Sequence, residues 1–277
     1  MDAFKLLISA LIIAVFISVP VSAEIFSCIK QGKTIFTDDK NKCDTEIKNI
    51  EVNIPKDTRV NYRYPQRQYE NKSSAYQIFI ELPESEKDKS NMDLAVKRLN
   101  KSLDYVFSKI PKSSHSYLKK VSFYIMLGPT AALGGEDNGL RYFPVSGDAH
   151  LLLGDKRWAH SIVIYNLENF LWLSDLWVNK VMVHELAHAW HYEDWPNNYP
   201  LLKQAWFSSR QSGLYLSQKD INGKLLKPAY ASTNEKEYFA ELSAIYFVGG
   251  DYYPFNRTEL KSYDPKGFSM LEAVWGI

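Results

Sequence analysis

The sequence predicts a protein of the α+β class. Short apolar runs typical of buried strands occur at residues 76–82, 121–127 and 160–166. Apolar residues with helical spacing lie between residues 90 and 110, and helical patterns return in the last hundred residues. The composition, 45% hydrophobic and 23% charged, is that of a globular protein.

The N-terminus has the pattern of a signal peptide. Lys5 supplies a short positive region, an apolar run extends from Leu6 to Val19, and the small residues Val21-Ser22-Ala23 follow. This order predicts cleavage after Ala23. The alternative is an uncleaved membrane anchor, but the apolar run is shorter than the ~20 residues that a bilayer requires. We therefore expect a secreted or periplasmic protein with no stable membrane insertion after cleavage.

A small β module is expected directly after the signal peptide. Strand-like segments from Ile25 to Lys30 and from Lys33 to Thr37 flank Gln31-Gly32, which is a hairpin signal. A polar segment follows and is interpreted as a linker. The expected organisation is a signal peptide at residues 1–23, a β module at 24–65, a linker at 66–75 and a main domain at 76–277.

The only two cysteines, Cys28 and Cys43, both fall in this module. In an exported protein, a lone close pair most simply forms one disulfide. Metal binding by the pair is the alternative, and it is less supported because no histidine lies nearby. We expect a disulfide between Cys28 and Cys43 that fastens the hairpin to the loop after it.

The main domain is expected to start with the strand at residues 76–82 and a long helix. Ser90, with Asp93 three residues later, predicts the start of this helix, and Pro111 predicts its end. Its apolar positions keep helical spacing and indicate a helix of the core. They are Met92, Val96, Leu99, Leu103, Val106 and Ile110.

Two classes of function are disfavoured. A formal net charge of +1 argues against binding to nucleic acid through bulk electrostatics. The glycine-rich loop at residues 128–147 lacks the G-x-x-x-x-G-K-[ST] arrangement and does not lead directly into a helix, so phosphate binding is not expected there.

The clearest chemical signal is the stretch VMVHELAHAWH, residues 181–191. On a helix, His184 and His188 lie one turn apart and within about 40° of each other, so both imidazoles can reach one ion. Glu185 projects beside them, where it can hold a water without being a ligand. This is the H-E-x-x-H pattern of zinc peptidases. The opposite side of the helix is expected to face the core, through Val183, Leu186, Ala187 and Trp190.

A catalytic zinc site needs a third protein ligand, with one position left for water. His191 lies a further turn along the helix, about 4.5 Å past His188, and is expected to pack at the edge of the cleft. Asp194 could be the third ligand only if the helix stopped near Tyr192. The metzincin continuation is excluded, since it requires glycine where this chain has His191 and histidine where it has Asp194.

A second helix, expected from Asn234 onward, offers the better candidates. Glu237 and Glu241 are four residues apart and share a face. One carboxylate could complete the metal site, and the other could accept a hydrogen bond from a ligand imidazole and fix its orientation. The alternative is that Glu235 or Glu237 only completes a capping box with Ser232 or Asn234.

At these residues the sequence resembles a known family. HELAHAWH, followed downstream by YASTNEKEYFAE (Tyr230 to Glu241) and YYPFNRTELKSYDP, is similar to the lethal-factor-like zinc metallopeptidases, named after the catalytic domain of anthrax toxin lethal factor. The resemblance is strong from Lys180 onward and extends weakly back to Tyr76. The receptor-binding and substrate-docking parts of the toxin have no counterpart, so its substrate cannot be transferred.

The resemblance implies a zincin-like domain of the gluzincin type, with an active-site helix and a second, glutamate-bearing helix. It implies one Zn²⁺ per chain, bound by His184, His188 and Glu237. It further implies that Glu185 is the general base, that Tyr230 stabilises the oxyanion or acts as an acid, and that Glu241 orients a histidine ligand.

The expected function is therefore that of an exported zinc-dependent endopeptidase acting on a peptide or protein substrate. The strand at residues 160–166 is the candidate for the cleft edge that pairs with the substrate backbone. Two alternatives stay open: an inactive binding protein of the same fold, and a zinc hydrolase acting on non-peptide amides.

Overall fold

The computed structural model describes residues 67–73, 75–83, 85–128, 139–145, 155–194, 199–226 and 228–277, and the backbone of 26–30 and 33–37. The chain divides into two compact units, Met1–Asn61 and Tyr62–Ile277. The predicted signal peptide, the Cys28–Cys43 disulfide and the side chain of Asp194 lie outside the described residues.

The first unit contains the expected hairpin. Strands β1 (Phe26–Lys30) and β2 (Lys33–Thr37) pair antiparallel, with Phe26 opposite Thr37 and Lys30 opposite Lys33. The prediction of two paired strands around Gln31-Gly32 is confirmed.

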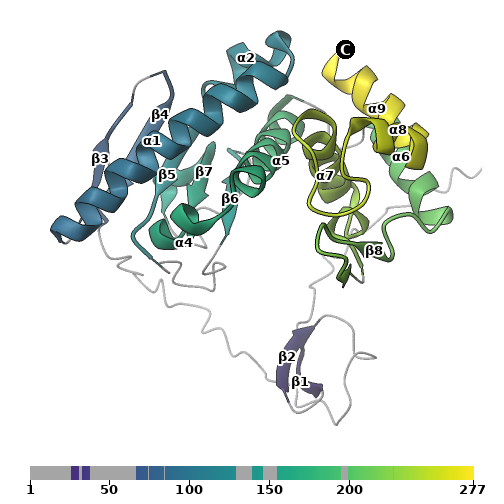
Figure 1. Cartoon of the computed structure of the whole chain (residues 1–277), viewed down its shortest axis with the longest axis horizontal. Coiled ribbons are helices and arrows are strands. Elements are labelled where there is room, and N and C mark those ends of the chain that lie inside the picture. Colours follow the sequence, from purple (N-terminus) through teal and green to yellow (C-terminus); the bar gives the residue numbers. More distant parts are fainter. Residues whose placement is uncertain are drawn as a thin grey trace, which may run out of the picture. The chain divides into compact units, whose positions relative to one another are not determined.

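The second unit combines a mixed five-stranded sheet with helices, so the α+β prediction is confirmed (Figure 1). The strand order is β3-β4-β5-β7-β6, in which the three inner strands run parallel and the two edge strands run antiparallel to their neighbours. The strands are β3 (Tyr69–Asn71), β4 (Gln77–Glu81), β5 (Ser122–Ile125), β6 (Leu140–Phe143) and β7 (Ser161–Ile164).

The position of β7 corrects the expectation about the cleft edge. β7 pairs with β5 on one side and with β6 on the other, so both of its backbone edges are used within the sheet. The edge strand on this side of the sheet is β6, which the sequence analysis placed in a glycine-rich loop. Four residues, Leu140 to Phe143, are too few to give a clear alternating pattern.

The short strand β3 corrects the expected linker at residues 66–75. Tyr69 packs edge-on against Tyr124 of β5, with ring centroids 4.9 Å apart, and its hydroxyl accepts a hydrogen bond from the Trp158 indole. These contacts come from residues far along the chain, so the polar composition around Tyr69 did not reveal them.

Helix α1 (Glu86–Lys109) starts earlier than predicted. Ser85 is its N-cap and accepts a hydrogen bond from the backbone N of Asp88, so the true N-cap lies five residues before Ser90. The predicted end is confirmed, because Ile110 caps the helix and Pro111 follows. The helix buries Met92, Ala95, Leu99, Ser102, Leu103, Val106 and Phe107.

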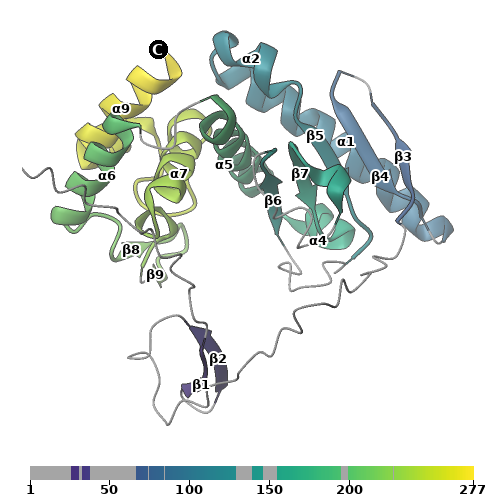
Figure 2. The same cartoon turned by 180° about the vertical axis from the view of Figure 1, so that it is seen from behind.

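Helix α5 (Asp175–Asp194) lies between the sheet and helix α7 (Glu235–Phe247), as both views show (Figures 1 and 2). It contacts α1, β6 and α7. All residues from Met182 to Ala189 are buried, which corrects the expectation of a helix with only one apolar face turned inward. Its histidine face is covered by α7.

The other helices complete the unit around this pair. α6, α8 and α9 pack on the side of α7 away from the sheet (Figure 1). In the part of the chain that the structure describes, no helix is both long and apolar enough to cross a membrane. The remaining elements are α2 (Lys112–Leu118), α4 (Leu167–Trp172), α6 (Pro200–Gln211), β8 (Gln218–Lys219), β9 (Leu225–Leu226), α8 (Arg257–Tyr263) and α9 (Pro265–Trp275).

The buried carboxylate of Asp264 connects helix α7, the start of α9 and the segment that follows α6. It accepts hydrogen bonds from the hydroxyls of Tyr238 and Tyr215, at 2.5 and 3.2 Å, and from the backbone N of Gly267 at 2.9 Å. Replacement by alanine would leave three buried donors unpaired. We expect Asp264→Ala to lower the free energy of unfolding by about 3 kcal/mol or more.

Urea denaturation followed by circular dichroism measures this change. Asp93→Asn is the matched control, because Asp93 is exposed on α1. Equal midpoints for Asp264→Ala and the wild type would contradict the assigned role.

Candidate metal centre

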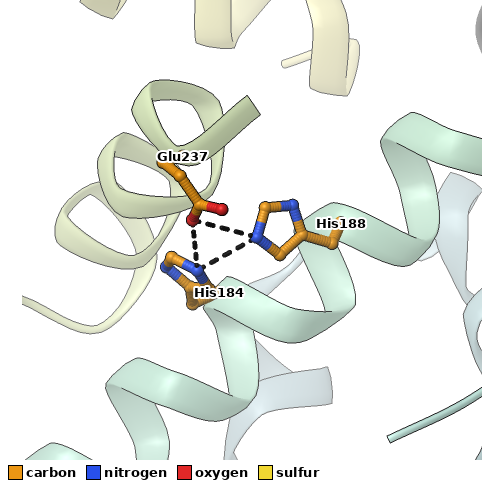
Figure 3. Close-up of side chains that lie close together, drawn as sticks. All are labelled: His184, His188 and Glu237. Carbon is orange, nitrogen blue, oxygen red and sulfur yellow. Dashed lines mark hydrogen bonds and ion pairs between the residues drawn. The ribbon is translucent and has the colours of Figure 1, made fainter. Parts of the chain in front are cut away.

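Three side chains converge between α5 and α7 (Figure 3). The Nε2 atoms of His184 and His188 lie 3.1 Å apart, and Oε2 of Glu237 lies 3.1 Å from the first and 3.2 Å from the second. Both histidines are buried. Two imidazole nitrogens and one carboxylate oxygen at this spacing form a donor set that could hold a metal ion.

The start of α7 sets the position of Glu237. The side chain of Asn234 is the N-cap and accepts hydrogen bonds from the backbone N of Lys236 and of Glu237. The Glu237 carboxylate bonds to the two histidines. The capping-box alternative for Glu237 is therefore wrong: Asn234 caps the helix, and Glu237 points at α5.

The electrostatics of the cluster favour a positive charge at its centre. Burial alone would lower the pKa of His184, but its hydrogen bonds to Glu237 and Glu241 outweigh burial and raise the pKa to about 10. Burial would likewise raise the pKa of Glu237, yet the hydrogen bonds from His184 and His188 lower it to about 2. Two facing imidazole nitrogens beside a carboxylate need a proton or a cation between them.

Behind the cluster lies a chain of alternating charges. Oε1 of Glu241 is 2.8 Å from Nδ1 of His184, and Oε2 of Glu241 is 3.0 Å from Nζ of Lys180. Lys180 also contacts Oδ1 of Asp251 at 2.7 Å. Burial opposes ionisation of Glu241, but Lys180 and His184 hold its pKa well below the ordinary value. Because Glu241 engages Nδ1 of His184, the Nε2 atom is the one that faces the cluster.

Glu185 is held from the sheet side. Its Oε2 accepts a hydrogen bond of 2.7 Å from the backbone N of Tyr142 in β6. The carboxylate is buried, and burial raises its pKa. Glu185 is thus fixed next to the three converging side chains without being one of them.

Tyr230 approaches the cluster from a short 3-10 helix, η3 (Tyr230–Ser232), just before α7. Its ring stacks on His184, with centroids 5.7 Å apart and planes 27° from parallel, and the residue is 53% exposed. Tyr230, His184 and Glu185 all line one cavity of about 450 Å³. A half-exposed hydroxyl-bearing side chain and a buried carboxylate therefore line the same cavity.

His191 is not part of the cluster. The residue is buried, and its ring packs against Tyr192 and Phe239 at centroid distances of 5.8 Å each. Burial, together with His188, lowers its pKa to about 4, so it behaves as a neutral core residue. The expectation that it lies at the cleft edge is wrong, because α7 covers this part of α5.

The sequence analysis missed three contributors: Lys180, Asp251 and the backbone N of Tyr142. Lys180 precedes His184 by four residues and therefore shares its helix face, a signal that was available. Asp251 follows α7 in an irregular segment, and no spacing rule points to it. The chain matches no protein-family model and no curated protein.

The charge chain gives a direct prediction for Lys180. We expect Lys180→Met to weaken the binding of added zinc by up to about 10–100-fold, the range for loss of groups behind a metal ligand, because Lys180 holds Glu241 and Glu241 holds His184. Methionine keeps the length of the side chain but removes the charge that fixes Glu241. Chelator competition measures the affinity, and Lys203→Met on α6 is the control. An unchanged zinc affinity in Lys180→Met would rule out the orienting role.

Proposed function

We propose that the protein is an exported zinc-dependent endopeptidase of the lethal-factor-like, gluzincin type. The observation that carries this proposal is the spacing of 3.1, 3.1 and 3.2 Å among the three donor atoms. Three ligands of a tetrahedral zinc ion with bonds of 2.0–2.1 Å are about 3.3 Å apart. Three protein ligands also leave one coordination position for water or substrate, as catalytic rather than structural zinc sites do.

Zinc held by His184, His188 and Glu237 would supply Lewis-acid chemistry, which activates water and polarises a carbonyl group. The residues around it would perform the proton transfers. Glu185 would take the proton of the attacking water and later pass it to the leaving amine. Oε2 of Glu185 accepts the hydrogen bond from the backbone N of Tyr142, so the proton transfers would use the other carboxylate oxygen.

Tyr230 would donate a hydrogen bond from its hydroxyl to the oxyanion that develops on the substrate carbonyl. Its stacking on His184 supports this role, because it limits the positions open to the ring. Glu241 and Lys180 would hold His184 in the orientation that binding requires.

The substrate would lie along β6 in extended form. Gly139 bonds to Tyr165 of the neighbouring segment, and alternate residues of an antiparallel strand face opposite edges, so the backbone of Leu140 faces away from β7. Gly139 and Leu140 also line the cavity that contains Glu185 and Tyr230. A peptide added to this edge would pass both groups.

Zinc analysis and a protease screen of the secreted protein together test the proposal. We expect one tightly bound zinc per chain and chelator-sensitive cleavage of an unfolded protein such as reduced casein. A folded protein that binds no zinc would refute the proposal. Zinc binding with no cleavage of any unfolded protein would favour one of the two alternatives, an inactive binding protein or a hydrolase of non-peptide amides.

A further inference from the structure

We propose that the cavity beside Glu185 binds a basic side chain of the substrate, arginine or lysine, and that Asp251 recognises its charge. The inference specifies the substrate class of the proposed peptidase and therefore rests on that proposed function. It is carried by the shape of the cavity and by the distribution of charge over its walls.

The cavity extends along α5 away from the metal cluster. Trp177, Val181 and His184 lie on successive turns and form one wall, so the cavity spans about 10 Å of the helix at 1.5 Å per residue. Leu226 and Pro228 also line the cavity. His188 and Glu237 are not among the lining residues, so the cavity opens from one side of the cluster only.

Among the residues that the structure describes, the lining carries three carboxylates and two cationic groups. The carboxylates are those of Glu185, Glu241 and Asp251. The cations are the ammonium of Lys180 and the imidazole of His184, whose pKa its hydrogen bonds raise to about 10 despite its burial. The ammonium is bonded to Glu241 at 3.0 Å and to Asp251 at 2.7 Å, so its charge is matched within the protein.

The three groups differ in their access to the cavity. The side chain of Lys180 is 10% exposed and that of Glu241 is 3% exposed, whereas that of Asp251 is 33% exposed. Only one oxygen of Asp251 contacts Lys180 in the described interactions. The charge that a substrate side chain meets is therefore a carboxylate, while the cation lies behind it.

A long basic side chain matches these features. Lysine and arginine lay their apolar stems along apolar surface and keep the charged end at a polar group. Trp177 and Leu226 would contact the stem, and Asp251 would receive the ammonium or guanidinium group. A neutral side chain would fill the space without using the carboxylate, and an acidic one would be repelled by it.

The first test uses a peptide that the enzyme cleaves, with each residue flanking the scissile bond replaced in turn by arginine or by its neutral isostere citrulline. At one position, kcat/KM for arginine should exceed that for citrulline by about tenfold, the effect of one hydrogen bond to a charged group. In Asp251→Asn this ratio should fall to about one. Both peptides are measured on the same variant, so an effect of the substitution on the metal site changes both values alike and leaves their ratio unchanged.

Two further variants make the result decisive. Asp93→Asn, which removes an exposed carboxylate of α1, should keep the wild-type ratio. Leu226→Lys, which keeps Asp251 and adds a competing cation to the cavity wall, should lower the arginine-to-citrulline ratio towards one and serves if Asp251→Asn fails to fold. An arginine-to-citrulline ratio near one at every position in the wild type would overturn the inference.

A binding measurement separates this inference from the peptidase proposal. Saturation-transfer NMR should show N-butylguanidinium, and not its neutral analogue N-butylurea, bound to the wild-type protein, with the signal lost in Asp251→Asn. If this binding is seen but no peptide is cut, the cavity assignment stands and the peptidase proposal fails. If neither compound is preferred, the cavity assignment fails whether or not peptides are cut.

Discussion

Glu185→Gln should leave zinc bound and reduce peptide cleavage by about 10²–10⁴-fold, the usual contribution of a positioned general base. Glutamine has nearly the same shape, and its amide oxygen can still accept the hydrogen bond from the backbone N of Tyr142. It cannot accept a proton from water at neutral pH. The loss should therefore appear in kcat, with little change in zinc content, KM or thermal stability.

The comparison requires equal zinc loading, measured on the same samples as the cleavage rates. Glu168→Gln is a suitable control, because this carboxylate lies on α4 and pairs with Lys87 at the surface. A Glu185→Gln protein that retains wild-type kcat with full zinc would remove Glu185 from the mechanism and leave the proton transfers to another group.

Glu237→Gln should weaken zinc binding by more than about 100-fold, beyond the 10–100-fold that loss of an orienting group causes. The substitution removes the single anionic donor among the three converging atoms. The matched control is Glu235→Gln, which alters a carboxylate in the same first turn of α7 but outside the donor set. Wild-type affinity in Glu237→Gln would exclude the proposed ligand set.

Zinc affinity should also depend on pH, with a definite sign. In the metal-free protein, the hydrogen bonds of His184 outweigh its burial and raise its pKa to about 10, so this imidazole carries a proton at neutral pH. Zinc must displace the proton, and the affinity should therefore rise as the pH rises from 6 to 8. Proton release on zinc binding, measured by calorimetry in buffers of different ionisation enthalpy, provides the check.

Much of the fold could be predicted from the sequence because its elements have long or strongly patterned runs. The inner strands β4, β5 and β7 each contain three consecutive apolar residues, and the end of α1 is marked by Pro111. The edge strands β3 and β6 were missed because each has only three or four residues and depends on contacts with distant segments. The start of α1 was misplaced because Ser90 and Asp93 repeat the spacing of the true N-cap Ser85 and Asp88.

The candidate site was predictable to the extent that helical spacing determines it. His184 and His188, four residues apart on α5, must share a face, and so must Glu237 and Glu241 on α7. Helical spacing cannot show that the two helices pack face to face, and that pairing came from the family resemblance. Asp251 and the backbone N of Tyr142 are brought to the site by the tertiary fold alone, so no local sequence pattern identifies them.

The bond between Glu185 and the backbone N of Tyr142 has a consequence for how this site can be studied. A main-chain donor is the same in every residue except proline, so exchanging the side chain at position 142 does not remove it. Alanine scanning would therefore register the loss of the buried Tyr142 ring and of its hydroxyl contact with His160, and would overlook the main-chain contact altogether. An amide-to-ester exchange, which replaces a single N–H by oxygen, is the substitution that would reveal how firmly the sheet holds this carboxylate.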